Sequence, residues 1–115
     1  MDAKQVRRAG LDYWEQVSVK VWPAWSRFEA EIPSLGEPYY LSAEAERTIW
    51  DVDFADRSVL VFGKETAGLP DEIREANRDR LCAIPMQNGS VRSLNVSTAI
   101  GIVLFEVLRQ RRTAR

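Results

Sequence analysis

The sequence contains no histidine and only one cysteine, and these absences remove several kinds of chemistry. Without histidine the chain lacks the commonest general base and the commonest metal ligand, and it cannot form a Ser-His triad. The single cysteine, Cys82, excludes an internal disulfide framework and a zinc site built from cysteines. We therefore expect a protein that works without a metal ion.

Long apolar runs and a secretion signal are also missing. No stretch approaches the roughly 18 consecutive apolar residues that a membrane-spanning helix needs. The first residues, from Met1 to Lys4, provide neither an apolar core nor a cleavage-like site. With 115 residues, 45% of them hydrophobic and 29% charged, the chain has the composition of one globular domain. We expect a cytoplasmic protein that does not enter a membrane.

The net charge is small, but the charged residues are unevenly distributed along the chain. The net charge is −1, yet basic residues cluster in segments 4–8 and 109–115, and acidic residues gather between Glu29 and Asp79. Basic clusters at the ends of a chain are ordinarily solvated tails. If the two ends meet in the fold or in a dimer, they instead form a basic patch suited to phosphate groups.

The first half of the chain alternates short strand and helix signals. The alternating valines of segment 17–21 predict a short strand. A helix is expected to open at Pro23 and to end at Pro33. Residues 39–41 predict another strand, and the polar stretch 42–56 predicts a loop with a turn or two of helix.

The second half predicts a parallel sheet. The continuous apolar run 58–62 is typical of a central strand buried on both faces. A helix follows from Pro70, a short strand covers 81–85, and a long helix runs from about Asn95 to Arg112. This alternation predicts an α/β fold, with a largely parallel sheet and flanking helices.

The last helix carries apolar residues around nearly its whole circumference. Such a helix needs cover on more than one side, and a domain of this size supplies one layer. The other layer is most simply a second copy of the chain. The apolar residues are Val96, Ala99, Ile100, Ile102, Val103, Leu104, Phe105, Val107 and Leu108.

Two loops carry the candidate chemistry. The first, 62–70, follows the predicted buried strand, at the end where α/β proteins bind ligands. It is not a phosphate-binding P-loop, because Leu69-Pro70 stands where Lys-Ser or Lys-Thr is required. The second, 84–97, leads into the long helix through residues suited to capping. Each loop fits an ordinary connection as well as a ligand site, so the residues alone leave both interpretations open.

Together these loops resemble a known family. The first reads Phe-Gly-x-Glu-x-x-Gly-Leu-Pro, and the second contains Ile-Pro-Met followed by Arg-Ser-Leu-Asn-x-Ser. These are similar to motifs 2 and 3 of the SpoU branch of SPOUT methyltransferases. With segment 7–13, the resemblance extends from about Lys4 to Gln110 and is closest to small enzymes that methylate the 2′-hydroxyl of the tRNA wobble cytidine or uridine. It implies S-adenosylmethionine as cofactor and tRNA as partner.

The resemblance also implies a site and an assembly. The family's α/β fold ends in a deep trefoil knot, whose loops hold the cofactor. The implied cofactor-binding residues are Leu41, Gly63, Ile84 and Ser93, the first three acting largely through the backbone, and the implied catalytic residues are Glu65 and Asn95. The family dimerises through the helix that follows Asn95, so a homodimer through the helix from Asn95 to Arg112 is expected.

One part of the family pattern does not occur in this sequence. The family begins with a strand and the motif Asn-x-Gly-Asn-x-x-Arg, whose arginine helps to activate the ribose hydroxyl. We therefore expect residues 1–115 to form a single methyltransferase domain that lacks its first strand and motif 1, and to transfer methyl groups weakly. The alternatives are a catalytically impaired dimer that binds S-adenosylmethionine or RNA, and an enzyme that methylates the 2′-hydroxyl of ribosomal RNA.

The remaining notable residues are Cys82 and the tryptophans. Cys82 lies in a predicted strand between apolar neighbours, which favours a buried structural thiol. Tryptophans at surfaces stack on nucleic-acid bases, but they more often belong to a core or an interface. The sequence leaves both roles open for Trp14, Trp22, Trp25 and Trp50.

Overall fold

The computed structural model describes residues 18–64, 67–86 and 95–113. The chain divides into two compact units, Met1–Glu31 and Ile32–Arg115, which are described separately. The predictions for Glu65, for Ser93 and for segment 4–13 lie outside the described residues.

The described part of the first unit is a short helix with an aromatic cluster. Helix α2 spans Trp25–Glu29, with Ala24 as its N-cap, so Pro23 precedes the helix instead of opening it. The rings of Trp22 and Trp25 pack on Phe28, with centroids 5.7 and 5.6 Å away. The strand predicted at 17–21 is wrong over its described residues, 18–21, which pair with no other described segment. Alternating side chains alone do not make a strand, because the backbone also needs a hydrogen-bonding neighbour.

The second unit begins with helix α3, Ile32–Leu35. The expectation that Pro33 ends the preceding helix is wrong, since α2 stops at Glu29 and Pro33 is the second residue of α3. A proline is tolerated there because the first turn of a helix uses no backbone N–H of its own.

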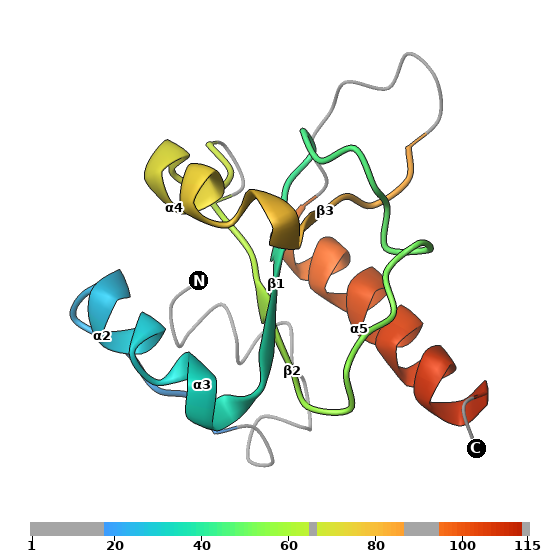
Figure 1. Cartoon of the computed structure of the whole chain (residues 1–115), viewed down its shortest axis with the longest axis horizontal. Helices are drawn as coiled ribbons and strands as arrows, with labels where there is room; N and C mark the ends of the chain where they lie inside the picture. Colours follow the sequence, from blue (N-terminus) through green and yellow to red (C-terminus); the bar gives the residue numbers. More distant parts are fainter. Residues whose placement is uncertain (1–17, 65–66, 87–94, 114–115) are drawn as a thin grey trace. The chain divides into compact units, whose positions relative to one another are not determined.

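Three parallel strands form the sheet of this unit (Figure 1). Strand β1 spans Glu37–Leu41, β2 spans Ser58–Val61 and β3 spans Leu81–Cys82, in the order β2-β1-β3. The prediction that 58–62 is the central strand is wrong within the described sheet, where β1 lies in the middle. A continuous apolar run indicates that both faces of a strand are covered, but it does not determine the position of that strand in the sheet.

The remaining helices agree with the sequence. Helix α4, Asp71–Ala76, follows Pro70, and the 3-10 turn η2, Arg78–Arg80, leads into β3. Helix α5 spans Val96–Thr113, within a residue or so of the expected bounds. Segment 42–57 connects β1 to β2 without any helix, although a turn or two was expected.

The core lies between the sheet, segment 49–54 and α5. In Figure 1 helix α5 lies to one side of β1 and α4 to the other. Strand neighbours face opposite ways, so Tyr39 points toward α5, and Tyr40, which is only 2% exposed, points away from it. The buried cluster on the α5 side comprises Tyr39, Ile49, Val52, Phe54, Cys82, Val103 and Val107.

These elements confirm an α/β fold with a small parallel sheet. No described helix is both long enough and apolar enough to cross a membrane. Helix α5 leaves part of its apolar surface uncovered within this chain: Ile102 (38% exposed), Leu104 (47%), Phe105 (74%) and Leu108 (47%).

Candidate cofactor site at the strand ends

Three of the predicted cofactor residues lie at the same edge of the sheet. Leu41 is the last residue of β1, Gly63 comes two residues after β2, and Ile84 comes two residues after β3. The strands are parallel and adjacent, and Leu41 is level with Cys82 in the register. All three residues are half-buried, so they remain accessible from this edge. The fold therefore gathers positions that are 43 residues apart in the chain (84 − 41) at one candidate site.

The loop after β2 is closed on itself. The Lys64 N–H donates to the Gly68 carbonyl at 3.3 Å, and the Gly68 N–H donates back to the Lys64 carbonyl at 2.8 Å. Gly68 has φ +67°, a left-handed conformation that favours glycine. A Cβ on Gly63 would overlap the backbone of Gly68 and Leu69. The loop geometry itself therefore requires glycine at position 63. The role of Gly63 beside the cofactor is implied by the family motif only.

The backbone at this edge has hydrogen-bonding capacity to offer a ligand. Among the described residues, no hydrogen bond engages the main chain of Gly63 or of Ile84. Half-buried N–H and C=O groups are normally paired with protein, water or ligand. Such groups fit the heteroatoms of an adenosine moiety, as the backbone role implied by the resemblance requires. The residues that are described here therefore fit S-adenosylmethionine.

Asn95 marks the start of α5. Its side-chain Oδ1 accepts a hydrogen bond from the Ser97 N–H at 2.9 Å and another from the Ser97 hydroxyl, which is the geometry of a helix cap. The amide Nδ2 of Asn95 has no partner in the described part of the chain. The two hydrogen bonds to Oδ1 thus orient the Asn95 side chain, and its Nδ2 group is available to donate to a ligand.

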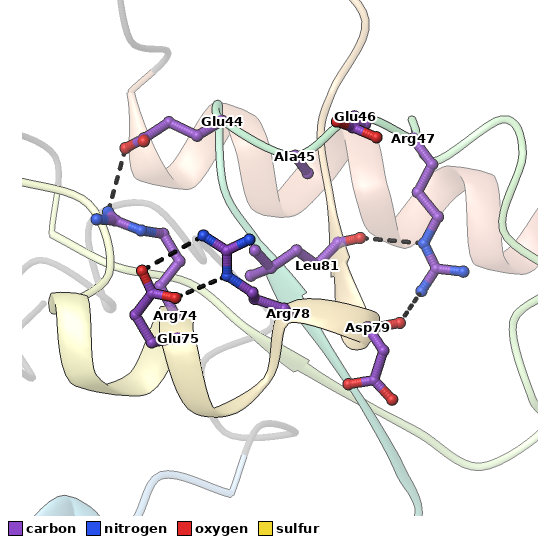
Figure 2. A pocket seen from close by; sticks show the side chains of 9 residues that line it. All are labelled: Glu44, Ala45, Glu46, Arg47, Arg74, Glu75, Arg78, Asp79 and Leu81. Atoms are coloured by element: carbon purple, nitrogen blue, oxygen red, sulfur yellow. Dashed lines mark hydrogen bonds and ion pairs between the residues drawn. The ribbon is translucent and has the colours of Figure 1, made fainter.

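A charged pocket of about 490 Å³ lies between the loop after β1 and the α4–η2 segment. Figure 2 shows Arg74 paired with Glu44 and Arg78 paired with Glu75. None of the predicted cofactor residues lines this pocket, so the structure separates it from the strand-end site. Its full lining is Glu44, Ala45, Glu46, Arg47, Arg74, Glu75, Arg78, Asp79 and Leu81.

Arg47 joins the pocket to the sheet. Its Nε donates to the Leu81 carbonyl at 3.1 Å and its Nη2 donates to the Asp79 carbonyl at 2.8 Å. These bonds tie the loop that follows the predicted cofactor residue Leu41 to the start of β3. Arg47 lies in neither family motif, and nothing in the sequence distinguishes it from a solvated arginine.

The prediction that Cys82 is a buried structural thiol is confirmed. It is fully buried, and burial raises the pKa of its thiol to about 11 against the opposing charge of Arg47. A thiol with such a pKa stays protonated and unreactive near neutrality. In the described residues no group of three or more acidic, cysteine or histidine side chains is arranged to hold a metal ion.

Known proteins are similar to this chain in sequence. The SpoU rRNA Methylase family model matches residues 1–105. The tRNA (cytidine(34)-2′-O)-methyltransferases of Acidovorax sp. and Polaromonas sp. are 36% and 37% identical over 96% of this chain, which covers 68% of each. A relative from Listeria innocua is 40% identical over 96% of the chain.

Solved structures agree with the sequence comparison. A structure that concerns the 2-OH methylation of C/U34 on tRNA superimposes with a TM-score of 0.82 at 35% identity, over 96% of this chain and 70% of its own. The SpoU methyltransferase AviRb from Streptomyces viridochromogenes, in complex with the cofactor AdoMet, gives 0.77 at 27% identity, over 97% and 46%. The fold is that of the SpoU methyltransferases. The chain belongs to the SpoU methylase family, and it spans 66% of the length of the Listeria innocua relative.

Proposed function

We propose that this chain forms the cofactor-binding part of an S-adenosylmethionine-dependent tRNA methyltransferase that acts on the ribose 2′-hydroxyl of the wobble nucleotide. The observation that carries the proposal is the meeting of Leu41, Gly63 and Ile84 at one sheet edge with main-chain groups available to a ligand. The relatives named for position 34 support the choice of nucleotide. In this proposal residues 1–115 belong to one domain with the family's C-terminal trefoil knot.

The chain's own residues would mainly bind and orient. The main chain of Leu41, Gly63 and Ile84 would hold the adenosine part of the cofactor, with Ser93 contributing from the second motif loop. Glu65 and Asn95 would lie beside the reacting groups as the catalytic residues. When bound, S-adenosylmethionine supplies an electrophilic methyl group on its sulfonium. Positioning of the two reactants accounts for most of the rate enhancement in such a transfer. Asn95 would donate a hydrogen bond through Nδ2, because its Oδ1 caps α5.

The proton of the ribose hydroxyl must leave during the transfer. The chain contains no histidine, so the acceptor would be an arginine, a substrate phosphate or water. Asn95 cannot serve as that acceptor, because its free group is a donor.

The protein would act as a homodimer through α5. Moving an apolar side chain from full exposure to full burial stabilises by roughly 1.5–3 kcal/mol. Covering Leu104 (47% exposed), Phe105 (74%) and Leu108 (47%) would gain a corresponding part of this for each residue. Gly101 lies one turn before Leu104 and Phe105, and a Cβ there would meet nothing within 4 Å, so the space beside this part of the helix is open. A second α5 across a twofold axis would cover this face.

Methyl transfer from labelled S-adenosylmethionine to bulk tRNA, followed by mapping of the modified nucleotide, tests the proposal. We expect label at the 2′-oxygen of nucleotide 34. The reaction should be run with this chain alone and with the same chain preceded by the first motif of a relative, since the sequence predicts weak transfer without that motif. Label in ribosomal RNA but not in tRNA, with either protein, would contradict the assignment.

A further inference from the structure

The tryptophans in the described part of the chain differ in their surroundings. Trp22 and Trp25 pack on Phe28, so their faces are partly occupied. Trp50 is 70% exposed, and its ring stacks on no other described aromatic side chain. An exposed indole ring offers a large flat apolar face on which another ring can stack.

Trp50 is exposed on a turn that is firmly held. Its neighbours Ile49 and Val52 are 1% and 4% exposed, so the chain is anchored in the core on both sides of the ring. Within the turn, the Thr48 N–H and hydroxyl both donate to Asp51 Oδ2 at 3.2 Å, and the Trp50 N–H donates to Thr48 Oγ1 at 3.3 Å. Little backbone freedom would be lost on binding, which favours a recognition role for the ring.

The turn is also fixed to the edge of the sheet that carries the candidate cofactor site. The Ala83 N–H donates to the Arg47 carbonyl at 3.0 Å, and the Ile49 N–H donates to the Ala83 carbonyl at 2.8 Å. Ala83 immediately precedes Ile84. Trp50 therefore directly follows Ile49, which is hydrogen-bonded to Ala83, the residue between β3 and Ile84.

The charges around Trp50 determine which kind of contact is favourable. Arg47 is held by two backbone carbonyls and forms no ion pair with a described carboxylate, so its charge is not neutralised locally. Glu46 and Asp53 are exposed acidic residues of the same segment, and Asp51 is engaged within the turn. Those carboxylates disfavour an extended contact with phosphates. They do not oppose stacking of a base, which depends on the ring.

We propose that Trp50 is a stacking platform for an unpaired base of the RNA substrate, next to the nucleotide that is methylated. This inference rests on the proposed function. Enzymes that act on single-stranded RNA loops commonly hold splayed bases on aromatic side chains. Because the contact is uncharged, its share of the affinity should not depend on salt.

The test measures RNA binding by the full chain, using fluorescence anisotropy of a labelled tRNA anticodon stem-loop. Trp50→Leu keeps an apolar side chain but removes the aromatic ring, and Trp50→Phe keeps a smaller ring. We expect Trp50→Leu to raise the Kd about tenfold, the effect of losing one base–aromatic stack, at both low and high salt. Trp50→Phe should recover most of that loss. Leu35→Ala is the matched control, because Leu35 is also exposed (43%) but precedes β1 at the opposite end of that strand.

Two further measurements separate the possible outcomes. Calorimetry should show unchanged S-adenosylmethionine affinity in Trp50→Leu, and light scattering should show an unchanged mass. Equal RNA affinity of Trp50→Leu and the wild type would overturn the inference while leaving the proposed function intact. A loss of mass in Trp50→Leu would identify a protein contact instead and would also overturn it. A wild-type chain that binds neither S-adenosylmethionine nor RNA would contradict the proposed function itself.

Discussion

Replacing Gln110 by alanine should destabilise the protein strongly, although the residue is polar and lies near the end of α5. The Gln110 side chain accepts a hydrogen bond from the Phe54 N–H at 2.9 Å through Oε1. Its Nε2 donates to the Val52 carbonyl at 2.8 Å and to Glu106 Oε2 at 2.9 Å. These contacts fasten α5 to segment 52–54, whose side chains Val52 and Phe54 belong to the core.

The expected magnitude follows from these three bonds. A hydrogen bond contributes about 0.5–1.5 kcal/mol net, and leaving a buried partner unsatisfied adds to the loss. We therefore expect Gln110→Ala to lower the free energy of unfolding by about 2–4 kcal/mol, a large share of the roughly 5–15 kcal/mol that a domain of this size has. Urea denaturation followed by circular dichroism, at fixed protein concentration, measures this change.

Arg111→Ala is the matched control, because Arg111 is the next residue on the same helix and is exposed. Its replacement should change stability by no more than about 0.5 kcal/mol. If Gln110→Ala and Arg111→Ala were equally stable, the reasoning that α5 is held through this side chain would be refuted.

Three other predictions concern the loop, the helix surface and pH. Gly63→Val should abolish S-adenosylmethionine binding in calorimetry by breaking the 64–68 loop closure, and unchanged affinity would contradict the loop geometry. Phe105→Asp should give a folded monomer in light scattering, because Phe105 is 74% exposed within one chain; an intact dimer would argue against the α5 interface. The hydrogen bond from Arg109 lowers the pKa of Glu106 below 4.5, so its stabilising contribution should persist above pH 4.5 and disappear as the pH falls through the lowered value. Denaturation of Glu106→Gln between neutral and acid pH should show a weaker acid dependence than the wild type, and an identical dependence would rule this out.

The sequence predicted the later helices better than the order of the strands. Strand β1 and helices α4 and α5 follow from local signals: a short apolar run for β1, Pro70 followed by two acidic residues for α4, and a long apolar stretch after capping residues for α5. The order of the strands was not predictable, because β1 takes the centre through pairing with segments far along the chain. The predicted strand at 17–21 and the predicted helix end at Pro33 were wrong because local sequence patterns do not show which segments pack or pair with each other in space.

The motifs located the candidate site but not the way it is built. Leu41, Gly63 and Ile84 come together as the resemblance implies. The reason for Gly63 lies in the backbone of its own loop, which no motif reveals. The anchoring contacts of Arg47 and Gln110 span more than thirty residues of sequence, and side chains of this type are usually solvated. Such contacts follow only from the three-dimensional arrangement.

The central claim is that the ends of β1, β2 and β3, with the start of α5, form a site for S-adenosylmethionine. Isothermal titration calorimetry of the 115-residue chain with S-adenosylmethionine tests it most directly, with circular dichroism to establish that the protein is folded. The account predicts saturable binding of one ligand per chain that S-adenosylhomocysteine competes away and that Gly63→Val abolishes. A folded wild-type chain that gives no binding heat at any temperature tested and shows no competition would contradict it.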